Sequence, residues 1–591
     1  MGSVKVTDYI ANFIAESGVT HVFGVTGGAA LHLIQSIVEN ESLTFVSCHD
    51  ERSAAMAADG YARGSNKIGV VISTSGPGAT NLITGVAGAY FDSVPLLIIT
   101  GQVSTFRLKG PSKIRQRGFQ ETPIIEMVSP ITKFQHQITN KDQVPEILNL
   151  AKEFALDARN GPVWVDIPDD IQRQSILTRF PARQTILEED APSNYATAIS
   201  KMLTKLGEAK RPLIVVGFGT HLSNSDQLFN QIALKMKIPI VATWGAASLV
   251  NEENENYLGT FGTHGMRHVN RAIHESDFIL SIGARLDLKA TGTPPSDFAP
   301  RAEKFIVDID SAEIEKLKSY QLKNIHSFVM DVNHFLSIVA VEVKGIDFQS
   351  ISEWREYLAQ IETVYTKQDM LLRDDASLEK INPYDFFSTL YKAITSRSAL
   401  VFDTGCTIAW GMQTLIKNNN IKTFHDFNNT AMGWSIPASI GIQMAGFDNI
   451  VCLVGDGSIM FTLNELVNLN RFGKNVKIFL FNNSGYGMIK QTQDQWLDGK
   501  YYASSTQQGL NFPDFRLVAE SIGMKYQLID SADKMKVLLT NVIESIGNIF
   551  CEILIDSNNS VIPIVKAGSA NIYMDPPLLE DIEHFSLNRK N

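Results

Sequence analysis

Short apolar runs and amphipathic stretches alternate along most of the 591-residue chain. The apolar runs, such as IGVVIST and IVCLVG, are continuous and end in glycine, serine or other turn residues, as strands buried on both faces do. The stretches between them carry apolar residues at helical spacing. This order predicts parallel sheets covered by helices on both faces. Because it recurs in three blocks, we expect an α/β protein of three doubly wound parallel-sheet domains.

Polar segments that lack this rhythm separate the blocks. Residues 179–195 predict a linker, and the charged sequence at 352–375 predicts a helix between the second and third blocks. The C-terminal stretch has few periodic apolar positions and contains Pro576 and Pro577, so we expect an extended tail there. We find no short repeat and no low-complexity segment. The expected units are a first domain at 1–180, a central domain at 192–345, a third domain at 381–566 and the tail at 567–591.

Composition narrows the classes of function. The net charge is 52 − 63 = −11, which disfavours a nucleic-acid partner. The N-terminus has no apolar h-region and the chain has no apolar run of about 18 residues, so we expect neither a signal peptide nor a membrane span. The four cysteines are widely separated and form no CxxC pair, which argues against a disulfide framework and a zinc site. We therefore expect a cytoplasmic enzyme.

The most specific motif is GDGS at 455–458, directly after the apolar run IVCLV, with Asn482 and Asn483 directly after the run KIFLF. Ligands of parallel sheets bind beyond the carboxyl ends of the strands. If these two strand ends lie close together, Asp456 and Asn483 supply oxygen ligands suited to Mg²⁺, and the glycines let the backbone approach a diphosphate. An isolated GDG is more often a tight turn. The asparagine pair at this distance favours the metal site.

This arrangement resembles the signature of thiamine diphosphate (ThDP) enzymes, in which NN follows GDG at this distance. The resemblance implies three Mg²⁺ ligands, namely Asp456, Asn483 and the backbone carbonyl of Gly485. It also implies cofactor contacts in the third domain, which would then bind the diphosphate of ThDP; these are Cys406, Met432, Gly455, Gly457, Ser458 and Met488.

A second motif, HDERSAAMAADGYAR, follows the apolar run LTFVSC. Taken alone, Glu51 is most simply an acidic residue in the first turn of a helix. The motif and the segment at 73–103, however, resemble the pyrimidine-binding domain of the acetolactate synthase (acetohydroxyacid synthase) branch. That resemblance implies that Glu51, in an apolar setting that raises its pKa, activates the cofactor, and that Gln120 faces the substrate. The implied cofactor-pocket residues of this domain are Gly27, Gly28, Gly76 and Asn81.

The central block carries several weaker motifs, among them VVGFG, SIGARLD and IVDID. In this order they resemble the FAD-binding domain of the same family, in which the flavin does no net redox work. Acidic residues at strand ends suit ribose hydroxyls, and arginines suit a pyrophosphate. The implied FAD contacts are Arg159, Gly217, Gly219, Thr243, His264, Gly283, Arg285, Asp287 and Asp308.

Departures from the family pattern concern the acceptor. Thr492 stands where biosynthetic members have a tryptophan, and Asp169 stands where they commonly have a lysine. Other changes replace residues near the cofactor without touching Glu51 or the metal ligands; these are Val25, Thr26, Ile408 and Ala409. A wider acceptor pocket with altered charge is expected.

The resemblance implies a ThDP-dependent carboligase that decarboxylates pyruvate or a similar 2-oxo acid and transfers the two-carbon acyl anion to a carbonyl acceptor. A second pyruvate and a nucleotide-linked keto-sugar are both open as acceptors. A flavin-dependent oxidase of 2-oxo acids and a non-catalytic homologue are the alternatives. Because the family builds its site between chains, we expect a homodimer or homotetramer.

Overall fold

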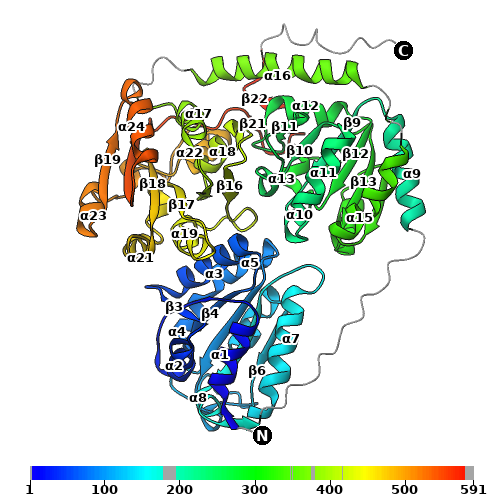
Figure 1. The fold of residues 1–591 in the computed structure, drawn as a ribbon. Coiled ribbons are helices and arrows are strands. Elements are labelled where there is room, and N and C mark those ends of the chain that lie inside the picture. The colour runs from blue at the N-terminus through cyan, green and yellow to red at the C-terminus, as the bar shows by residue number, and fades with distance from the viewer. Residues whose placement is uncertain are drawn as a thin grey trace.

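The computed structural model describes residues 3–177, 195–346, 348, 351–374, 380–415 and 417–578. It contains three six-stranded parallel sheets with helices on their faces, which confirms the predicted fold class (Figure 1). Nearly all of the linker predicted at 179–195, and the tail beyond residue 578, lie outside the described residues.

The N-terminal sheet has the strand order β3-β2-β4-β5-β7-β6. Its strands are β2 (His21–Gly24), β3 (Thr44–Ser47), β4 (Gly69–Ser73), β5 (Leu96–Gln102), β6 (Phe134–Gln137) and β7 (Val163–Pro168). The helices of this domain are α1 (Val6–Glu16), α2 (Leu31–Glu39), α3 (Glu51–Ser65), α4 (Pro77–Asn81), α5 (Ile83–Phe91), α6 (Ile124–Val128), α7 (Val144–Leu156) and α8 (Asp169–Gln172). Strands β1 (Ser3–Lys5) and β8 (Ser175–Leu177) form a separate antiparallel pair.

The middle sheet has the order β11-β10-β9-β12-β13-β14, the 3-2-1-4-5-6 order of dinucleotide-binding folds. Its strands are β9 (Pro212–Val216), β10 (Ile240–Ala242), β11 (Tyr257–Thr260), β12 (Phe278–Ile282), β13 (Glu303–Asp308) and β14 (Ile325–Val329). The helices are α9 (Tyr195–Glu208), α10 (Gly219–Leu222), α11 (Asp226–Met236), α12 (Arg267–Glu275), α13 (Leu288–Thr291), α14 (Ser311–Ser319), α15 (Val332–Glu342) and α16 (Ser352–Arg373). Helix α16 matches the charged helix predicted from the sequence, and it runs across the top of Figure 1 from this domain towards the next.

The C-terminal sheet, β16-β15-β17-β18-β20-β19, has the same chain order across the sheet as the N-terminal one. Its strands are β15 (Ser398–Phe402), β16 (Ile421–Phe424), β17 (Asn449–Gly455), β18 (Asn475–Asn482), β19 (Lys525–Ile529) and β20 (Ile549–Leu554). The helices are α17 (Pro383–Ala393), α18 (Cys406–Thr414), α19 (Ser435–Met444), α20 (Asp456–Ile459), α21 (Leu466–Phe472), α22 (Gly487–Trp496), α23 (Phe515–Ser521) and α24 (Ala532–Glu544).

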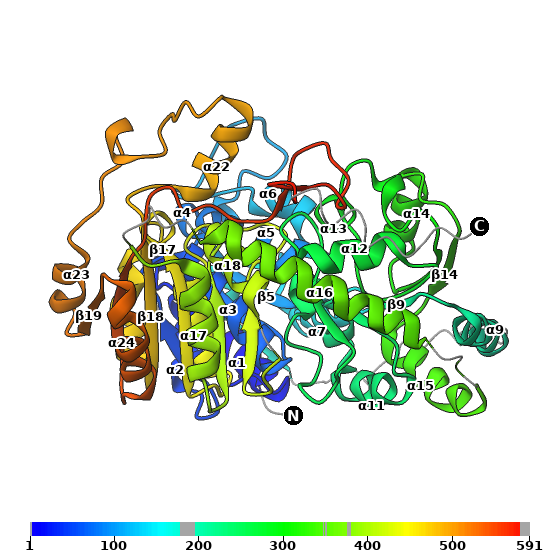
Figure 2. The same cartoon turned by 90° about the horizontal axis from the view of Figure 1, so that it is seen from above.

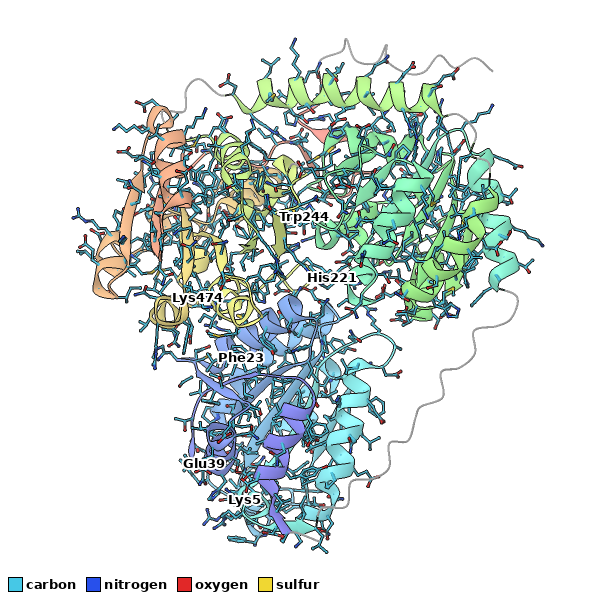
Figure 3. All side chains as sticks on the ribbon, viewed as in Figure 1. Lys5, Phe23, Glu39, His221, Trp244 and Lys474 are labelled. Carbon is cyan, nitrogen blue, oxygen red and sulfur yellow. The ribbon has the colours of Figure 1, made fainter. Side chains whose placement is uncertain are left out.

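Helices α3 and α19 join the N- and C-terminal domains. Their backbones come so close that a Cβ on Gly441 would lie 1.8 Å from the Ala57 carbonyl oxygen, and one on Gly60 would lie 2.4 Å from the Ala438 carbonyl oxygen. Only glycine fits at these two positions. The middle domain is joined to the C-terminal domain by contacts such as Ser248 to Thr423, and Figure 3 places Trp244 at the same boundary.

The described part of the C-terminal segment packs on the middle domain. Strand β22 (Met574–Asp575) pairs with β21 (Ile564–Val565), and Arg267 donates to the carbonyl oxygens of Met574 and Pro576. Figure 2 shows this segment passing from the C-terminal domain towards α12 and α13. The described part of the predicted tail, residues 567–578, therefore consists of turns and the short strand β22, and it is anchored on the middle domain.

Two further expectations can be compared with the fold. No helix in the described ranges is long and apolar enough to cross a membrane. All four cysteines are buried and free.

Candidate active site

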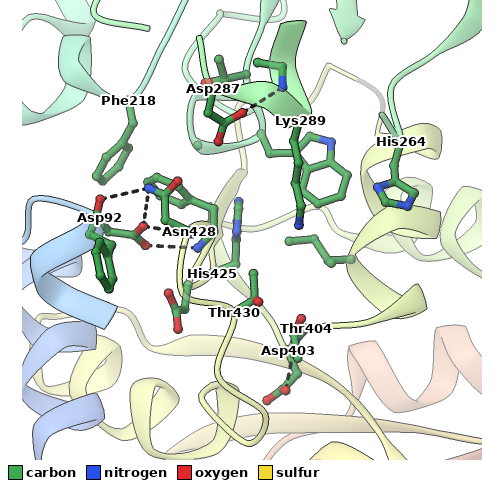
Figure 4. Close-up of a pocket in the computed structure, with 18 of the residues that line it drawn as sticks. Asp92, Phe218, His264, Asp287, Lys289, Asp403, Thr404, His425, Asn428 and Thr430 are labelled. Atoms are coloured by element: carbon green, nitrogen blue, oxygen red, sulfur yellow. Dashed lines mark hydrogen bonds between the residues drawn. The ribbon is translucent and has the colours of Figure 1, made fainter. Parts of the chain in front are cut away.

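A cavity of about 580 Å³ lies where the three domains meet, and its lining residues come from all of them (Figure 4). This volume is in the range of small-molecule and cofactor sites. Most of the residues predicted to bind cofactors line it; they are Arg159, Gly219, Thr243, His264, Gly283, Arg285, Asp287, Asp308, Cys406, Met432, Gly455, Asp456, Gly457, Ser458, Asn483, Gly485 and Met488. Gly217 does not line the cavity; a Cβ there would lie 2.2 Å from the Gly283 carbonyl oxygen, so it serves the approach of β9 to β12.

Asp456 connects two strand ends in this cavity. It follows β17, and its carboxylate accepts hydrogen bonds from the backbone N–H groups of Gly457 (2.7 Å), Asn483 (3.1 Å) and Gly485 (3.2 Å), the last two of which follow β18. Burial raises the pKa of Asp456 to about 7 although these bonds oppose the shift. A carboxylate, an amide and a backbone carbonyl gathered here form a hard oxygen donor set that fits Mg²⁺.

The backbone around Asp456 leaves room for a diphosphate. A Cβ on Gly455 would meet nothing within 4 Å, whereas one on Gly457 would collide with the Tyr486 ring at 2.3 Å. Glycine at 455 thus exposes the backbone to the cavity, and glycine at 457 is required by packing. Cys406 is buried beside the same space, and burial raises the pKa of its thiol to about 12, so it is a neutral lining group.

Asp403, which the sequence analysis missed, holds the segment that carries Met432. Its buried carboxylate accepts hydrogen bonds from the backbone N–H groups of Thr404 (3.0 Å), Gly433 (3.0 Å) and Ser435 (2.9 Å). Figure 4 shows Asp403 and Thr404 at the edge of the cavity. The signal that could have found Asp403 was its place at the end of the apolar run ALVFDTG, where ligand-binding loops begin.

The middle-domain side of the cavity carries a cluster of charged side chains. Arg159 Nη1 lies 2.8 Å from Glu313 Oε1 and 2.9 Å from Asp310 Oδ2, and Arg285 Nε lies 3.2 Å from Glu313 Oε1. Burial acts to raise the pKa of Glu313, but hydrogen bonds and charge from Lys316 and Arg159 outweigh it and lower this pKa to about 2. Both predicted arginines are thus present but paired with Glu313, for which the sequence offered no signal.

Polar groups without partners face the same region. The Trp244 Nε1 and His264 Nε2 atoms are buried and have no hydrogen-bond partner among the described residues. Burial lowers the pKa of His264 to about 4 and raises that of Asp308 at the end of β13. Asp287 instead caps α13 by accepting from the Ala290 N–H at 2.9 Å. A polar ligand that supplies hydrogen-bonding groups, such as a dinucleotide, fits this half of the cavity.

The residues predicted around Glu51 form a second cluster. Asn81 Nδ2 donates to Glu51 Oε2 (2.8 Å), and a Cβ on Gly78 would lie 3.3 Å from Glu51 Oε1. Gln120 has a left-handed φ of 63° and packs beside Gly76. A Cβ added to Gly76 would lie 3.0 Å from the Cβ of Gln120. These residues gather at the carboxyl edge of the N-terminal sheet.

The first glycine pair belongs to the same edge. A Cβ on Gly27 would lie 2.5 Å from the Thr74 side chain, while one on Gly28 would meet nothing within 4 Å. None of the predicted N-terminal residues other than Arg159 lines the large cavity, and Glu51 is half-exposed. The expected burial of Glu51 in an apolar setting is therefore not met within a single chain.

The residues that depart from the family pattern can also be located in the structure. Thr492 donates its hydroxyl to the Met488 carbonyl oxygen of its own helix α22 (2.9 Å), and Asp169 accepts from the Ser104 hydroxyl. Ile408 lines the cavity, while Ala409 is buried in α18.

Comparisons with known proteins agree with these features. Models of three thiamine pyrophosphate (ThDP) enzyme domains match the chain: the N-terminal TPP binding domain at residues 4–127, the central domain at 199–337 and the C-terminal TPP binding domain at 403–553. The acetolactate synthase large subunit of Lactococcus lactis subsp. lactis (strain IL1403) is 32% identical over 94% of this chain and 93% of its own length. The acetolactate synthase isozyme 2 large subunit of Escherichia coli (strain K12) is 30% identical over 96% of this chain and 98% of its own length. The acetolactate synthase large subunit of Cyanidium caldarium is 29% identical over 96% of this chain and 95% of its own length.

Proposed function

The chain belongs to the thiamine pyrophosphate enzyme family, in its acetolactate synthase-like branch, and from this we propose that it is a ThDP-dependent carboligase. It decarboxylates pyruvate or a similar 2-oxo acid and transfers the two-carbon unit to a carbonyl acceptor. The acceptor is a second 2-oxo acid or a nucleotide-linked keto-sugar. The four free, buried cysteines support a cytoplasmic location.

The observation that carries this proposal is the meeting of Asp456, Asn483 and Gly485 at two adjacent strand ends on the cavity. These residues would hold Mg²⁺, and Gly455, with its open backbone, would face the diphosphate. When bound, ThDP supplies the carbon nucleophile that attacks the 2-oxo acid and stabilises the unit left after CO₂ departs. Asp403 keeps the Met432 segment in place against this part of the site.

Glu51 would handle the proton that activates the cofactor. The Asn81 amide donates to Glu51 Oε2, so a proton on the carboxyl group is carried by Oε1. Gln120, fixed against Gly76, orients the donor. Glu51 is half-exposed in one chain, and a general acid works best in a pocket that excludes water. The proposed role of Glu51 therefore requires a further surface that shields it from water.

A second chain would complete the site. The Glu51 cluster and the Asp456 cavity are separate in one chain, and apolar side chains are exposed beside Gln120, including Phe119 at 85%. An exposed patch of this kind is typical of an interface. We infer a homodimer or homotetramer in which the Glu51 cluster of one chain covers the cavity of another.

FAD would occupy the middle-domain half of the cavity. FAD would offer polar groups to the unpartnered nitrogens of Trp244 and His264 and to the carboxylate of Asp308. Its phosphates would bind Arg159 and Arg285, which would then pair less closely with Glu313. Its role would be structural.

The test is incubation with ¹³C-labelled pyruvate, ThDP, Mg²⁺ and a panel of carbonyl acceptors, with CO₂ release and product mass as readouts. Glu51→Gln should lower turnover by about 10² or more, the scale of a lost acid–base group. Glu41→Gln, on an exposed site of the same domain, is the matched control and should leave turnover unchanged. Near-normal turnover of Glu51→Gln would contradict its role, and flavin bleaching by pyruvate without a condensed product would indicate an oxidase instead.

A further inference from the structure

An unusually basic loop lies between β5 and α6. Residues 105–121, here called the basic loop, contain five cationic side chains and one acid, so the loop carries 5 − 1 = +4 in a chain of net charge −11. Four of the cations are exposed and one is half-buried. None forms an ion pair with any residue that the structure describes. The five are Arg107, Lys109, Lys113, Arg115 and Arg117.

The loop is held in shape by carboxylates that leave its cations unpaired. Glu121, 8% exposed, accepts hydrogen bonds from the backbone N–H groups of Lys109 (2.6 Å), Arg117 (2.8 Å) and Gly118 (3.2 Å). These bonds hold the first and last parts of the loop together. Because Glu121 binds backbone groups rather than the cationic side chains, it fixes the loop while the loop keeps its net charge of +4.

The base of the loop is fixed in the same way. Asp170 accepts from the backbone N–H (2.9 Å) and the hydroxyl (2.6 Å) of Thr105, and Asp169 accepts from the Ser104 hydroxyl. The neighbouring acids are thus engaged by backbone and hydroxyl donors. The cationic heads remain available to a ligand, so the loop is a built feature rather than an ordinary solvated run of charge.

The loop ends at the residue proposed to face the substrate. Gln120 directly precedes Glu121 and packs against Gly76 at the carboxyl edge of the sheet, the edge that also carries Glu51. A simple 2-oxo acid has one carboxylate and needs one cation. Five cations on one loop at this edge match a ligand with several negative charges, and arginine side chains suit phosphate oxygens in particular.

We propose that the basic loop binds the phosphate or diphosphate group of the carbonyl acceptor. This inference rests on the proposed carboligase function and names the class of acceptor for the same site. A phosphorylated ketone and a nucleoside-diphosphate-linked keto-sugar share this chemistry, and the experiment distinguishes them.

The first measurement is calorimetry on the holoenzyme saturated with ThDP and Mg²⁺, so that the cofactor's own diphosphate site is filled. Uridine diphosphate and inorganic pyrophosphate are the probes, and uridine is the neutral control. The double variant Lys113→Gln/Arg115→Gln should bind the diphosphate probes about tenfold or more weakly than the unmodified enzyme, because two charge-assisted contacts are lost. The control variant Lys235→Gln/Lys536→Gln changes the net charge equally at exposed sites and should not alter binding.

The second measurement compares kcat/KM for dihydroxyacetone phosphate and dihydroxyacetone as acceptors. The ratio of the two values should fall about tenfold in the loop variant and stay constant in the control. Binding of uridine diphosphate but not pyrophosphate would assign the nucleotide-linked class, and equal binding of both would assign the simpler phosphate class.

Three outcomes would overturn the proposal. They are an unmodified enzyme that binds neither diphosphate probe, a loop variant that binds both as tightly as the unmodified enzyme, and a loop variant that sediments as a smaller species, which would assign the cations to a subunit contact. Failure of the carboligase function itself reads out separately, as an absence of CO₂ release from any 2-oxo acid by the unmodified enzyme.

Discussion

Replacing Arg63 by methionine should lower the stability of the folded chain, because Arg63 links the N- and C-terminal domains. Arg63 lies in α3, and its guanidinium donates to Asp59 (2.8 Å) and Asp92 (2.8 Å), both almost fully buried. It also lies 5.3 Å from the centre of the Trp434 ring and 5.5 Å from that of Phe427, on the C-terminal domain. These carboxylates hold the pKa of Arg63 above its usual value even though burial opposes it.

The magnitude follows from what the substitution leaves behind. Methionine fills most of the volume, but two buried carboxylates lose the cation that pairs with both of them, and breaking a buried pair in this way costs about 3–5 kcal/mol. A cooperative unit of about 150–250 residues, the size of one domain, loses about 2–4 °C of Tm per kcal/mol. A loss of about 3–5 kcal/mol should therefore lower Tm by about 6–20 °C in scanning calorimetry. Replacing Arg516, whose pair with Glu520 lies on the surface, is the control and should leave Tm within error.

The pH dependence provides a stricter test. Burial already raises the pKa of Asp92, and without Arg63, whose charge opposes that shift, its folded-state pKa rises further above that of the unfolded chain. A raised folded-state pKa gives stability that is present at low pH and lost as the pH rises through that value. The Tm difference between the unmodified enzyme and the variant should therefore be smaller at pH 5 than at pH 8. A difference that does not change with pH, or a loss no larger than that of the Arg516 variant, would refute the reasoning.

Three further predictions concern packing, the cation and a buried acid. Gly441→Ala should lower Tm and speed proteolysis between the domains, because its Cβ would lie 1.8 Å from a carbonyl oxygen of α3, whereas Gly345→Ala, which meets nothing within 4 Å, should not. Asp456→Asn should weaken Mg²⁺-dependent ThDP binding by about 100-fold or more in calorimetry, and unchanged binding would exclude it as a ligand. Burial and nearby Asp92 raise the pKa of Asp426 to about 7, so its charge destabilises the fold increasingly as the pH rises from about 4 to 7. The Tm of Asp426→Asn relative to the unmodified enzyme should therefore increase over that range, and a constant difference would contradict this.

The sequence predicted features that depend on local pattern. Continuous apolar runs ending in turn residues became the strands of three parallel sheets. The rule that parallel strands present their carboxyl ends at one edge placed Asp456 near Asn483, and β17 and β18 are indeed adjacent, with the Asn483 N–H donating to Asp456. Such inferences succeed because each needs only the order of neighbouring elements.

Features that depend on how domains dock could not be predicted in this way. Glu313 pairs with Arg159, 154 residues earlier, and the Arg63 guanidinium reaches the His425 carbonyl oxygen across 362 residues. No local pattern marks these partners, since an exposed acid on a helix and one that binds two arginines have the same sequence appearance. The half-exposed state of Glu51 is of the same kind, because the exposure of a side chain depends on how the folded elements surround it and not on the local sequence.

The N- and C-terminal domains are related by a repeat that the sequence hides. Both sheets have the chain order 2-1-3-4-6-5, and α3 and α19 each follow the second strand of their domain. These two helices meet reciprocally, Gly60 against Ala438 and Gly441 against Ala57, so each uses an alanine and a glycine three residues apart. Packing therefore constrains equivalent positions in the same way in both domains. The strand ends carry no such constraint, and there the third strand leads into SGPG in one domain and GDGS in the other. Divergence at these ends gives each copy a different half of the chemistry while the helix contact that joins them stays symmetric.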